Sequence, residues 1–279
     1  MAKKTCVLLI LVASSLLSLT AQAENKRVYT FGIVPQFEIR HIRKIWNPIF
    51  NEIEKNTGYK LKLVGSPTIP DFESEFIAGK FDFAYMNPYH LLVAKQSQDY
   101  IPLVRDNGRK LHGILVTRHD SDITTVKDLH GKKVAFPAPN ALGASLLMRA
   151  ILNKEFKIDI KPVYVKTHSS VYLNVVVKQA AAGGAVQKTL SQQRKNIQGA
   201  LHVLYRTPKV APHPIAAHPR VPKKVREKIK QTFLKLGKNP TGKALLEKIP
   251  MKKIGTASMG DYTPLRKFKL DEFFVKTHN

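Results

Sequence analysis

Short runs of β-forming residues alternate with helical segments along most of the chain, and this alternation constrains its fold more than any other feature. A strand is expected at 28–34. In the segment after it, Ile42, Ile49 and Ile53 fall on one apolar face at helical spacing. Further strands are expected at 59–63, 81–86, 132–136, 163–166 and 201–205. Such alternation is typical of α/β proteins with parallel sheets.

Two polar or proline-rich segments predict that the chain is divided into two lobes. The chain is expected to cross between lobes near 117–122, at a polar turn, and near 206–213, in a proline-dense extended segment. Each lobe is expected to be a mostly parallel sheet flanked by helices. The predicted division is a signal peptide at 1–23, a first lobe of 24–117 plus 209–279, and a second lobe of 118–208.

The first 23 residues have the features of a secretory signal peptide. Lysines near the start precede an apolar run at 7–17 and the small-residue site Ala21-Gln22-Ala23. We therefore expect export to the periplasm and a soluble mature protein that begins near Glu24. The single cysteine, Cys6, lies inside the predicted signal, so neither a disulfide nor a lipid anchor is expected.

The charge of the chain is strongly positive, with 46 Lys and Arg against 20 Asp and Glu and a formal net charge of +26. Most of the excess lies after residue 117. A field of this sign attracts anions, including small solutes, acidic surfaces and nucleic acid. Finger spacings, aromatic runs of the RNA-binding type and helix-turn-helix patterns do not accompany the charge, so no nucleic-acid partner is expected.

Catalytic signatures do not occur in the sequence. It has no nucleophile elbow, no metalloprotease motif and no Walker loop. The ten histidines are scattered, which does not indicate a metal site. We expect no catalytic residue, no metal and no cofactor. An exported enzyme lacks a nucleophile and base pair here, so binding is favoured over catalysis.

Residues 128–145 predict a turn, a buried strand, a tight loop and then the start of a helix. The first turn of a helix has unpaired N–H groups and the positive end of the helix dipole. Asn140, Ala141, Leu142 and Gly143 are therefore candidates for an anion cradle made of backbone donors. In the alternative interpretation, Asn140 merely caps a core helix.

Other candidates lie at the ends of expected strands, where open α/β sheets bind ligands. Tyr85 and Asn87 surround the end of the strand at 81–86, and Tyr85 can equally be a core or rim aromatic. His168 and Ser169 follow the strand at 163–166. His168 can donate to an anion, or it can help Ser169 to cap the next helix.

Several motifs, taken in order, resemble the phosphate, phosphite and phosphonate substrate-binding proteins of ABC transporters. The resemblance implies a type II periplasmic-binding-protein fold whose two lobes close over one ligand. It also implies an aromatic residue near the start of the second helix, which is Phe72 here. The motifs are Gly32-Ile33-Val34-Pro35, Trp46-Asn47-Pro48, Thr57-Gly58, Phe81-Asp82-Phe83-Ala84-Tyr85-Met86-Asn87-Pro88, Val126 to Phe136 and Thr167-His168-Ser169.

The chain departs from this family at three positions. Asn140-Ala141-Leu142-Gly143 replaces the family's Ser-Thr-Ser-Gly, so the hydroxyl donors are missing. Gly183-Gly184-Ala185 lacks the family's acid, which weakens the case for an amino-bearing ligand. Phe72 stands where a tyrosine is usual. These departures leave the identity of the bound anion open.

The expected function is that of a monomeric periplasmic solute-binding protein of an ABC importer. It would capture a small phosphonate-, phosphite- or phosphate-like oxyanion by lobe closure and deliver it to a membrane permease. The alternative is a sensory adapter of the same fold that presents its ligand to a membrane receptor kinase. The expected ligand-binding residues are Phe72, Tyr85, Asn87, Asn140, Ala141, Leu142, Gly143, His168 and Ser169.

Overall fold

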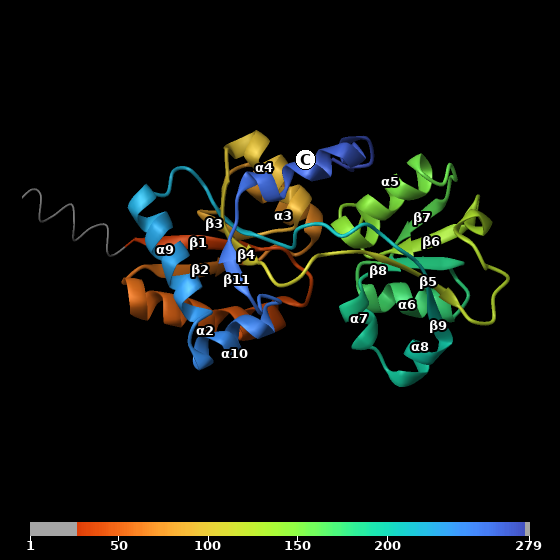
Figure 1. Cartoon of the computed structure of the whole chain (residues 1–279), viewed down its shortest axis with the longest axis horizontal. Helices are drawn as coiled ribbons and strands as arrows, with labels where there is room; N and C mark the ends of the chain where they lie inside the picture. The colour runs from red at the N-terminus through yellow and green to blue at the C-terminus, as the bar shows by residue number, and fades with distance from the viewer. Residues whose placement is uncertain (1–26, 277–279) are drawn as a thin grey trace, which may run out of the picture.

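The computed structural model describes residues 27–276 and has two lobes, each built on one β-sheet with helices against it (Figure 1). One sheet has six strands and the other has five. This confirms the predicted two-lobe α/β fold. The predicted signal peptide lies outside the described residues. No helix within 27–276 combines the length and apolar character that crossing a bilayer requires.

The first lobe contains the six-stranded sheet, in the order β11-β4-β10-β3-β1-β2. β1 pairs in parallel with β2 and β3, whereas β10 and β11 pair antiparallel to their neighbours. The elements are β1 (Val28–Ile33), α2 (Ile39–Thr57), β2 (Lys60–Val64), α3 (Ile69–Ile77), β3 (Phe83–Tyr85), α4 (Pro88–Gln98), β4 (Ile101–Asp106), β10 (Ile215–Ala217), α9 (Lys223–Leu236), α10 (Pro240–Lys248) and β11 (Ile254–Thr256).

The second lobe contains the five-stranded sheet, in the order β7-β6-β8-β5-β9. β6 pairs in parallel with β7 and β8, and β5 pairs antiparallel with β8 and β9. The elements are β5 (Ile114–Arg118), η1 (Val126–Leu129), β6 (Lys133–Phe136), the π-helical turn η2 (Leu142–Leu146), α5 (Leu147–Lys154), β7 (Lys161–Tyr164), α6 (His168–Val176), β8 (Ala182–Ala185), α7 (Gln187–Ser191), α8 (Lys195–Ala200) and β9 (Leu201–Arg206).

Both sheets are mixed rather than mostly parallel, because β10 and β11 run opposite to the other strands of the first sheet and β5 runs opposite to the other strands of the second. The lobe boundary also differs from the prediction. β5 was assigned to the first lobe up to residue 117, but it lies in the second sheet, so the first crossing is at 107–113 and not at 117–122. An apolar, buried strand can pair within either sheet, so its sequence does not reveal which sheet it joins.

The two crossings run beside each other and are hydrogen-bonded together. The backbone N–H of Gly113 donates to Thr207 Oγ1 at 2.8 Å, and the N–H of Thr207 donates to the Gly113 carbonyl at 3.0 Å. Leu111 and Val210 form an antiparallel bridge one step further along. This pairing makes the crossings a short two-stranded hinge between the lobes.

The C-terminal segment, with the 3₁₀ turns η3 (Met259–Asp261), η4 (Thr263–Phe268) and η5 (Leu270–Glu272), contacts both lobes (Figure 1). On the first lobe, the Phe274 ring packs on Tyr89 with 5.6 Å between centroids. On the second lobe, Arg149 donates to the Phe273 carbonyl at 2.8 Å and Lys154 pairs with Glu272 at 2.8 Å. The segment is therefore a third connection between the lobes.

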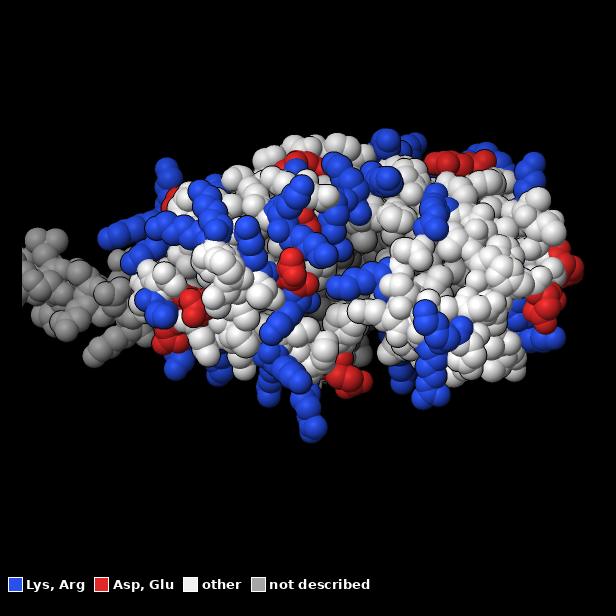
Figure 2. Space-filling view, turned by 60° about the horizontal axis from the view of Figure 1, so that its bottom comes forward, with Lys and Arg blue, Asp and Glu red and all other residues white. Residues whose placement is uncertain are grey.

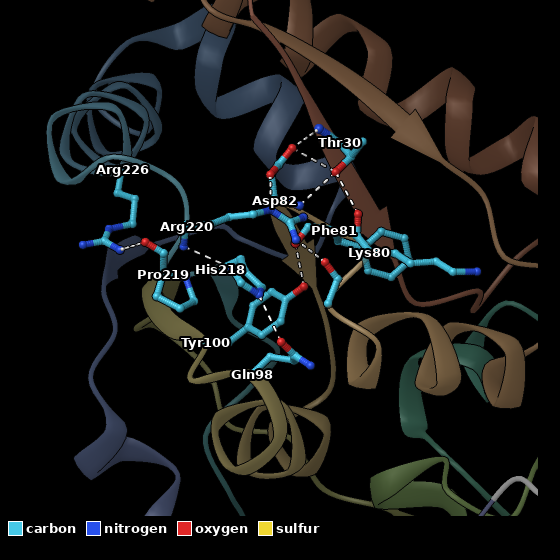
Figure 3. Close-up of polar contacts among 11 residues, drawn as sticks. Thr30, Lys80, Phe81, Asp82, Gln98, Tyr100, His218, Pro219, Arg220 and Arg226 are labelled. Atoms are coloured by element: carbon cyan, nitrogen blue, oxygen red, sulfur yellow. Dashed lines mark hydrogen bonds and ion pairs between the residues drawn. The ribbon is translucent and has the colours of Figure 1, made fainter.

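A polar cluster around Asp82 secures the first sheet at the end opposite the carboxyl ends of β1 and β3 (Figure 3). One carboxylate oxygen of Asp82 accepts from the backbone N–H of Thr30 at 2.9 Å, and the other accepts from Arg220 Nε at 2.7 Å. Burial alone raises the pKa of Asp82, but the hydrogen bonds from Arg220 and Thr30 outweigh it, so the pKa lies below its ordinary value. The cluster joins β1, β3 and the turn after β10.

Candidate functional site

A cavity of about 680 Å³ lies between the lobes, with the crossings as part of its wall. The carboxyl ends of β1 and β3 reach it from the first lobe through Val34 and Tyr85. The loops after β6, β7 and β8 reach it from the second lobe. Figure 2 shows Lys and Arg side chains spread densely over the first lobe and extending to the gap between the lobes. Cavities of this size between lobes are typical ligand sites.

The turn after β6 forms one wall of the cavity through Ala141, Leu142 and Gly143. The first N–H groups bonded within this turn are those of Ser145 and Leu146, which both donate to the Ala141 carbonyl, at 2.7 and 3.2 Å. The Ala141 N–H donates to the Ala138 carbonyl at 3.4 Å, a long hydrogen bond. The N–H groups of residues 142–144 belong to the opening of a helix, where no carbonyl of the helix itself can reach them. The wall therefore offers backbone donors, as the sequence predicts, although contact with a ligand stays a prediction.

Gly143 packs against the first crossing as well as lining the cavity. A Cβ on Gly143 would lie 3.2 Å from the backbone nitrogen of Gly113, which is tight, and a Cβ on Gly113 would lie 1.8 Å from the Gly143 carbonyl oxygen. The two backbones can approach this closely only because both residues are glycine. Gly143 therefore has a packing role as well as a place in the cavity wall.

Asn140 is outside the cavity wall and ties the second lobe to the first. Its side-chain Nδ2 donates to Glu73 Oε2 and to the Val275 carbonyl, both at 2.8 Å, and its side-chain Oδ1 accepts from the Val275 N–H at 3.0 Å. Glu73 Oε1 in turn lies 2.8 Å from His90 Nε2. Asn140 makes no capping bond to the helical turn that follows it. Asn140 therefore forms a buried link between the lobes. It neither lines the cavity nor caps the helical turn.

Tyr85 and Asn87 line the cavity from the first lobe and are both buried. Asn87 caps α4 by accepting from the N–H groups of Tyr89 and His90, so most of its hydrogen-bonding capacity is used in structure. Burial raises the pKa of Tyr85 to about 12, which keeps its hydroxyl protonated. Tyr85 also stacks on His213, with centroids 5.3 Å apart.

His213, on the second crossing, is a wall residue that the sequence reading did not select. Burial, followed by repulsion from Arg109 and His90, lowers its pKa to about 3. It is therefore neutral at pH 7. Its Nε2 lies 3.0 Å from Gln36 Nε2, which fits an imidazole that accepts from the amide and keeps a proton on Nδ1.

His168 lines the cavity from the start of α6, and burial lowers its pKa to about 4. It can donate one hydrogen bond as a neutral imidazole. Thr167 performs the capping that was an alternative role for His168 and Ser169, since its hydroxyl accepts from the Ser170 N–H at 3.1 Å. Ser169 is not in the wall, and its hydroxyl accepts from Gln193.

Phe72 is also absent from the wall. It lies fully buried in the core of the first lobe, where its ring stacks on Phe81 at 5.4 Å and packs on Phe76 at 5.5 Å. The residue occupies the inner face of α3, together with Phe76 one helical turn later. The expected ligand contact is replaced by core packing.

Five Lys and Arg side chains line the cavity, and sequence reasoning identified none of them. The acidic side chain found in the wall, within residues 27–276, is Glu38. The pKa of Lys188 is lowered by burial and then by repulsion from Arg109 and Lys252, so these cations stand close enough to oppose one another. The five are Arg109, Lys110, Lys166, Lys188 and Lys248.

The chemistry of the wall is that of an anion receptor. Backbone N–H groups, neutral imidazoles and cationic side chains all donate hydrogen bonds, and few acceptors oppose them. In the part of the chain that the structure describes, no three His, Cys, Asp or Glu side chains are grouped as metal ligands would be. The arrangement therefore favours capture of a negatively charged solute.

Comparison with known proteins identifies one family to which the chain is similar over most of its length. Residues 31–262 match the family model described as "ABC transporter, phosphonate, periplasmic substrate-binding protein". The chain is 26% identical, over an alignment of 227 positions, to the phosphate-import protein PhnD of Mycolicibacterium smegmatis, and the match covers 73% of this chain and 70% of that protein. It is 22% identical over 271 residues to the phosphonates-binding periplasmic protein of Escherichia coli, covering 92% of this chain and 80% of that protein.

The fold matches solved structures of the same kind. PhnD1 of Prochlorococcus marinus in complex with methylphosphonate superposes with a TM-score of 0.77 at 16% sequence identity, over 88% of this chain and 98% of that one. At this identity the superposition establishes the fold, a type II periplasmic binding protein.

Proposed function

The chain belongs to the periplasmic substrate-binding proteins of phosphonate ABC transporters, and we propose that it captures a phosphonate-like oxyanion between its two lobes and delivers it to a membrane permease. Members of this family bind substrates and are not enzymes. No comparison supports the sensory adapter that was the alternative expectation. Export through a signal peptide at residues 1–23 is part of the proposal, and mass spectrometry of the mature N-terminus tests it.

One observation carries the proposal: cations from separate parts of the chain converge on one cavity. Arg109 comes from the first crossing and Lys188 from the start of α7 in the second lobe. Arg109 lowers the pKa of Lys188 and of His213, which sits on the other crossing. Positive charges grouped where water is partly excluded repel one another and destabilise the fold. A bound anion relieves this repulsion, so the grouping favours anion binding.

Lobe closure is the proposed mechanism of capture. The paired crossings at 107–113 and 207–214 are the hinge about which the lobes would rotate. A ligand favours the closed state only through contacts that it makes better in that state. We propose that its oxygens accept from Ala141 to Gly143 and from His168, while Arg109 and Lys188 neutralise its charge.

Isothermal titration calorimetry with methylphosphonate tests the proposal. Arg109→Gln and Lys188→Gln should each weaken binding about ten- to a hundredfold, the loss expected for one charge-assisted hydrogen bond. Lys127→Gln is the control, because Lys127 is an exposed lysine of the same lobe outside the cavity. If methylphosphonate, phosphite and phosphate all fail to bind, or if the control loses as much affinity as the two cavity variants, the proposal is wrong.

Small-angle scattering tests closure separately from binding. The radius of gyration should fall when the bound anion is added, as it does when hinged lobes close. An unchanged radius together with measurable calorimetric binding would mean that the site is formed without closure.

A further inference from the structure

The cavity also limits which phosphonates fit it. Before the proposed closure its volume is about 680 Å³, several times what a methylphosphonate needs, since one water molecule occupies about 30 Å³ of liquid and methylphosphonate has only a few heavy atoms. Closure of the lobes would reduce this volume, so the choice of substituent depends on the chemistry of the wall.

Charge and apolar surface are separated within the cavity. Four of the five cations come from the crossings or the second lobe, which places the charged head of a ligand on that side. The wall on the first lobe contains Phe37, Ile45 and Ile69. Phe37 is 45% exposed, and its ring makes a T-shaped contact with the His41 ring, with 5.2 Å between centroids. An aromatic ring left open at the wall of a binding cavity is apolar surface that a ligand can cover.

The wall offers few anionic partners to a ligand that carries an ammonium group. A buried ammonium is strongly destabilised unless an anionic group pairs with it. Glu38 is the acidic side chain that the wall contains among the described residues, and it is exposed near the start of α2. At the other end of the cavity, an ammonium would meet the field of Arg109 and Lys188. An uncharged substituent avoids both penalties.

We infer that the ligand is an organophosphonate with an uncharged apolar substituent larger than methyl, bound with its phosphonate group toward the second lobe and its substituent against Phe37. This inference rests on the proposed function and narrows it. It assigns the two sides of the cavity different roles: the crossings and second lobe bind the charge, and the first lobe selects the substituent.

Three phosphonates separate these roles in calorimetry. Propylphosphonate and 2-aminoethylphosphonate have the same number of heavy atoms and differ in a terminal methyl against an ammonium. Propylphosphonate should bind about tenfold more tightly than methylphosphonate, as expected for burial of two additional methylenes. It should also bind at least tenfold more tightly than 2-aminoethylphosphonate.

Variants locate the selection. Phe37→Ser should reduce the preference for propylphosphonate over methylphosphonate, measured as the ratio of their dissociation constants. Leu173→Ser is the matched control, because Leu173 is an equally exposed apolar residue, at 50%, on α6 and outside the cavity wall. It should alter neither affinity. Glu38→Gln should leave propylphosphonate affinity unchanged.

The outcomes distinguish this inference from the function on which it rests. If methylphosphonate binds but 2-aminoethylphosphonate binds as well as propylphosphonate, or if propyl shows no gain over methyl, the inference is overturned and the proposed function stands. If Phe37→Ser leaves the propyl preference intact, the substituent does not lie against Phe37. If none of the three compounds binds, both proposals are overturned.

Discussion

Replacement of Asn140 by alanine should destabilise the protein far more than loss of a helix cap would. A capping residue contributes about 1 kcal/mol. Asn140 instead makes two hydrogen bonds with the backbone of Val275 and one with the Glu73 carboxylate. Neutral hydrogen bonds contribute about 0.5 to 1.5 kcal/mol each and those to a charged group about 1.5 to 3 kcal/mol. Since Val275 is partly exposed, its bonds count at the lower end, and the expected loss is about 3 kcal/mol.

Urea denaturation followed by circular dichroism measures this loss. Asn153→Ala is the control, because Asn153 donates one hydrogen bond to the Asp159 carboxylate at 2.9 Å on the exposed surface. It should cost less than about 1 kcal/mol, as surface substitutions usually do. If Asn140→Ala costs no more than Asn153→Ala, the buried link between Asn140, Glu73 and Val275 does not contribute as argued.

Three further predictions concern the hinge and two titratable groups. Gly113→Ala should lower the melting temperature more than Gly143→Ala, because only the first places a Cβ against a carbonyl oxygen, at 1.8 Å; equal melting temperatures would contradict the close approach. The pKa of Asp82 is lowered in the folded state, so the stability that its carboxylate contributes is present above the unfolded pKa near 4 and is lost as the pH falls further. Asp82→Asn weakens the bond with Arg220 and should flatten the acid limb of a curve of stability against pH. An unchanged acid limb would refute this. The pKa of His213 is about 3 in the folded protein and about 6.5 in the unfolded chain, so between these pH values the unfolded chain binds more protons. Stability should therefore fall from pH 7 toward pH 4. His213→Gln should remove part of this pH dependence, and a pH dependence identical to that of the parent would count against a buried neutral imidazole.

The sequence predicts the fold well where periodicity is strong. α2 carries Ile42, Trp46, Ile49 and Ile53 on its buried face, and the helix is found where their spacing places it. β5 shows the limit of this reasoning. Its first three residues, 114–116, are apolar and fully buried, so they indicate a strand but not the sheet to which it belongs. The pairing that decides the lobe boundary is long-range.

The candidate site could be predicted in part, because carboxyl ends of parallel strands converge at one edge of a sheet. That rule brings Tyr85, Asn87 and the turn after β6 to the cavity wall. It does not identify Arg109 or His213, which lie on the crossings. No periodic pattern marks those segments, and the residues enter the cavity only because the two lobes face each other across them.

Phe72 shows how a family position can mislead. The resemblance placed an aromatic ligand contact at the second helix, whereas here the same helix directs Phe72 and Phe76 into the core. Asn140 is a second case, since a polar residue before a helix is most often a cap. Its actual partners, Glu73 and Val275, are distant in sequence and cannot be inferred from local pattern.

A crystal structure of the protein with propylphosphonate would show where each end of the ligand binds. We expect closed lobes with the phosphonate group between the Ala141–Gly143 turn and the side chains of Arg109, Lys188 and His168, and with the propyl group against Phe37. Phosphonate density outside the cavity, or inside it with the phosphonate group turned toward Phe37 and away from the cations, would contradict both the proposed function and the proposed orientation.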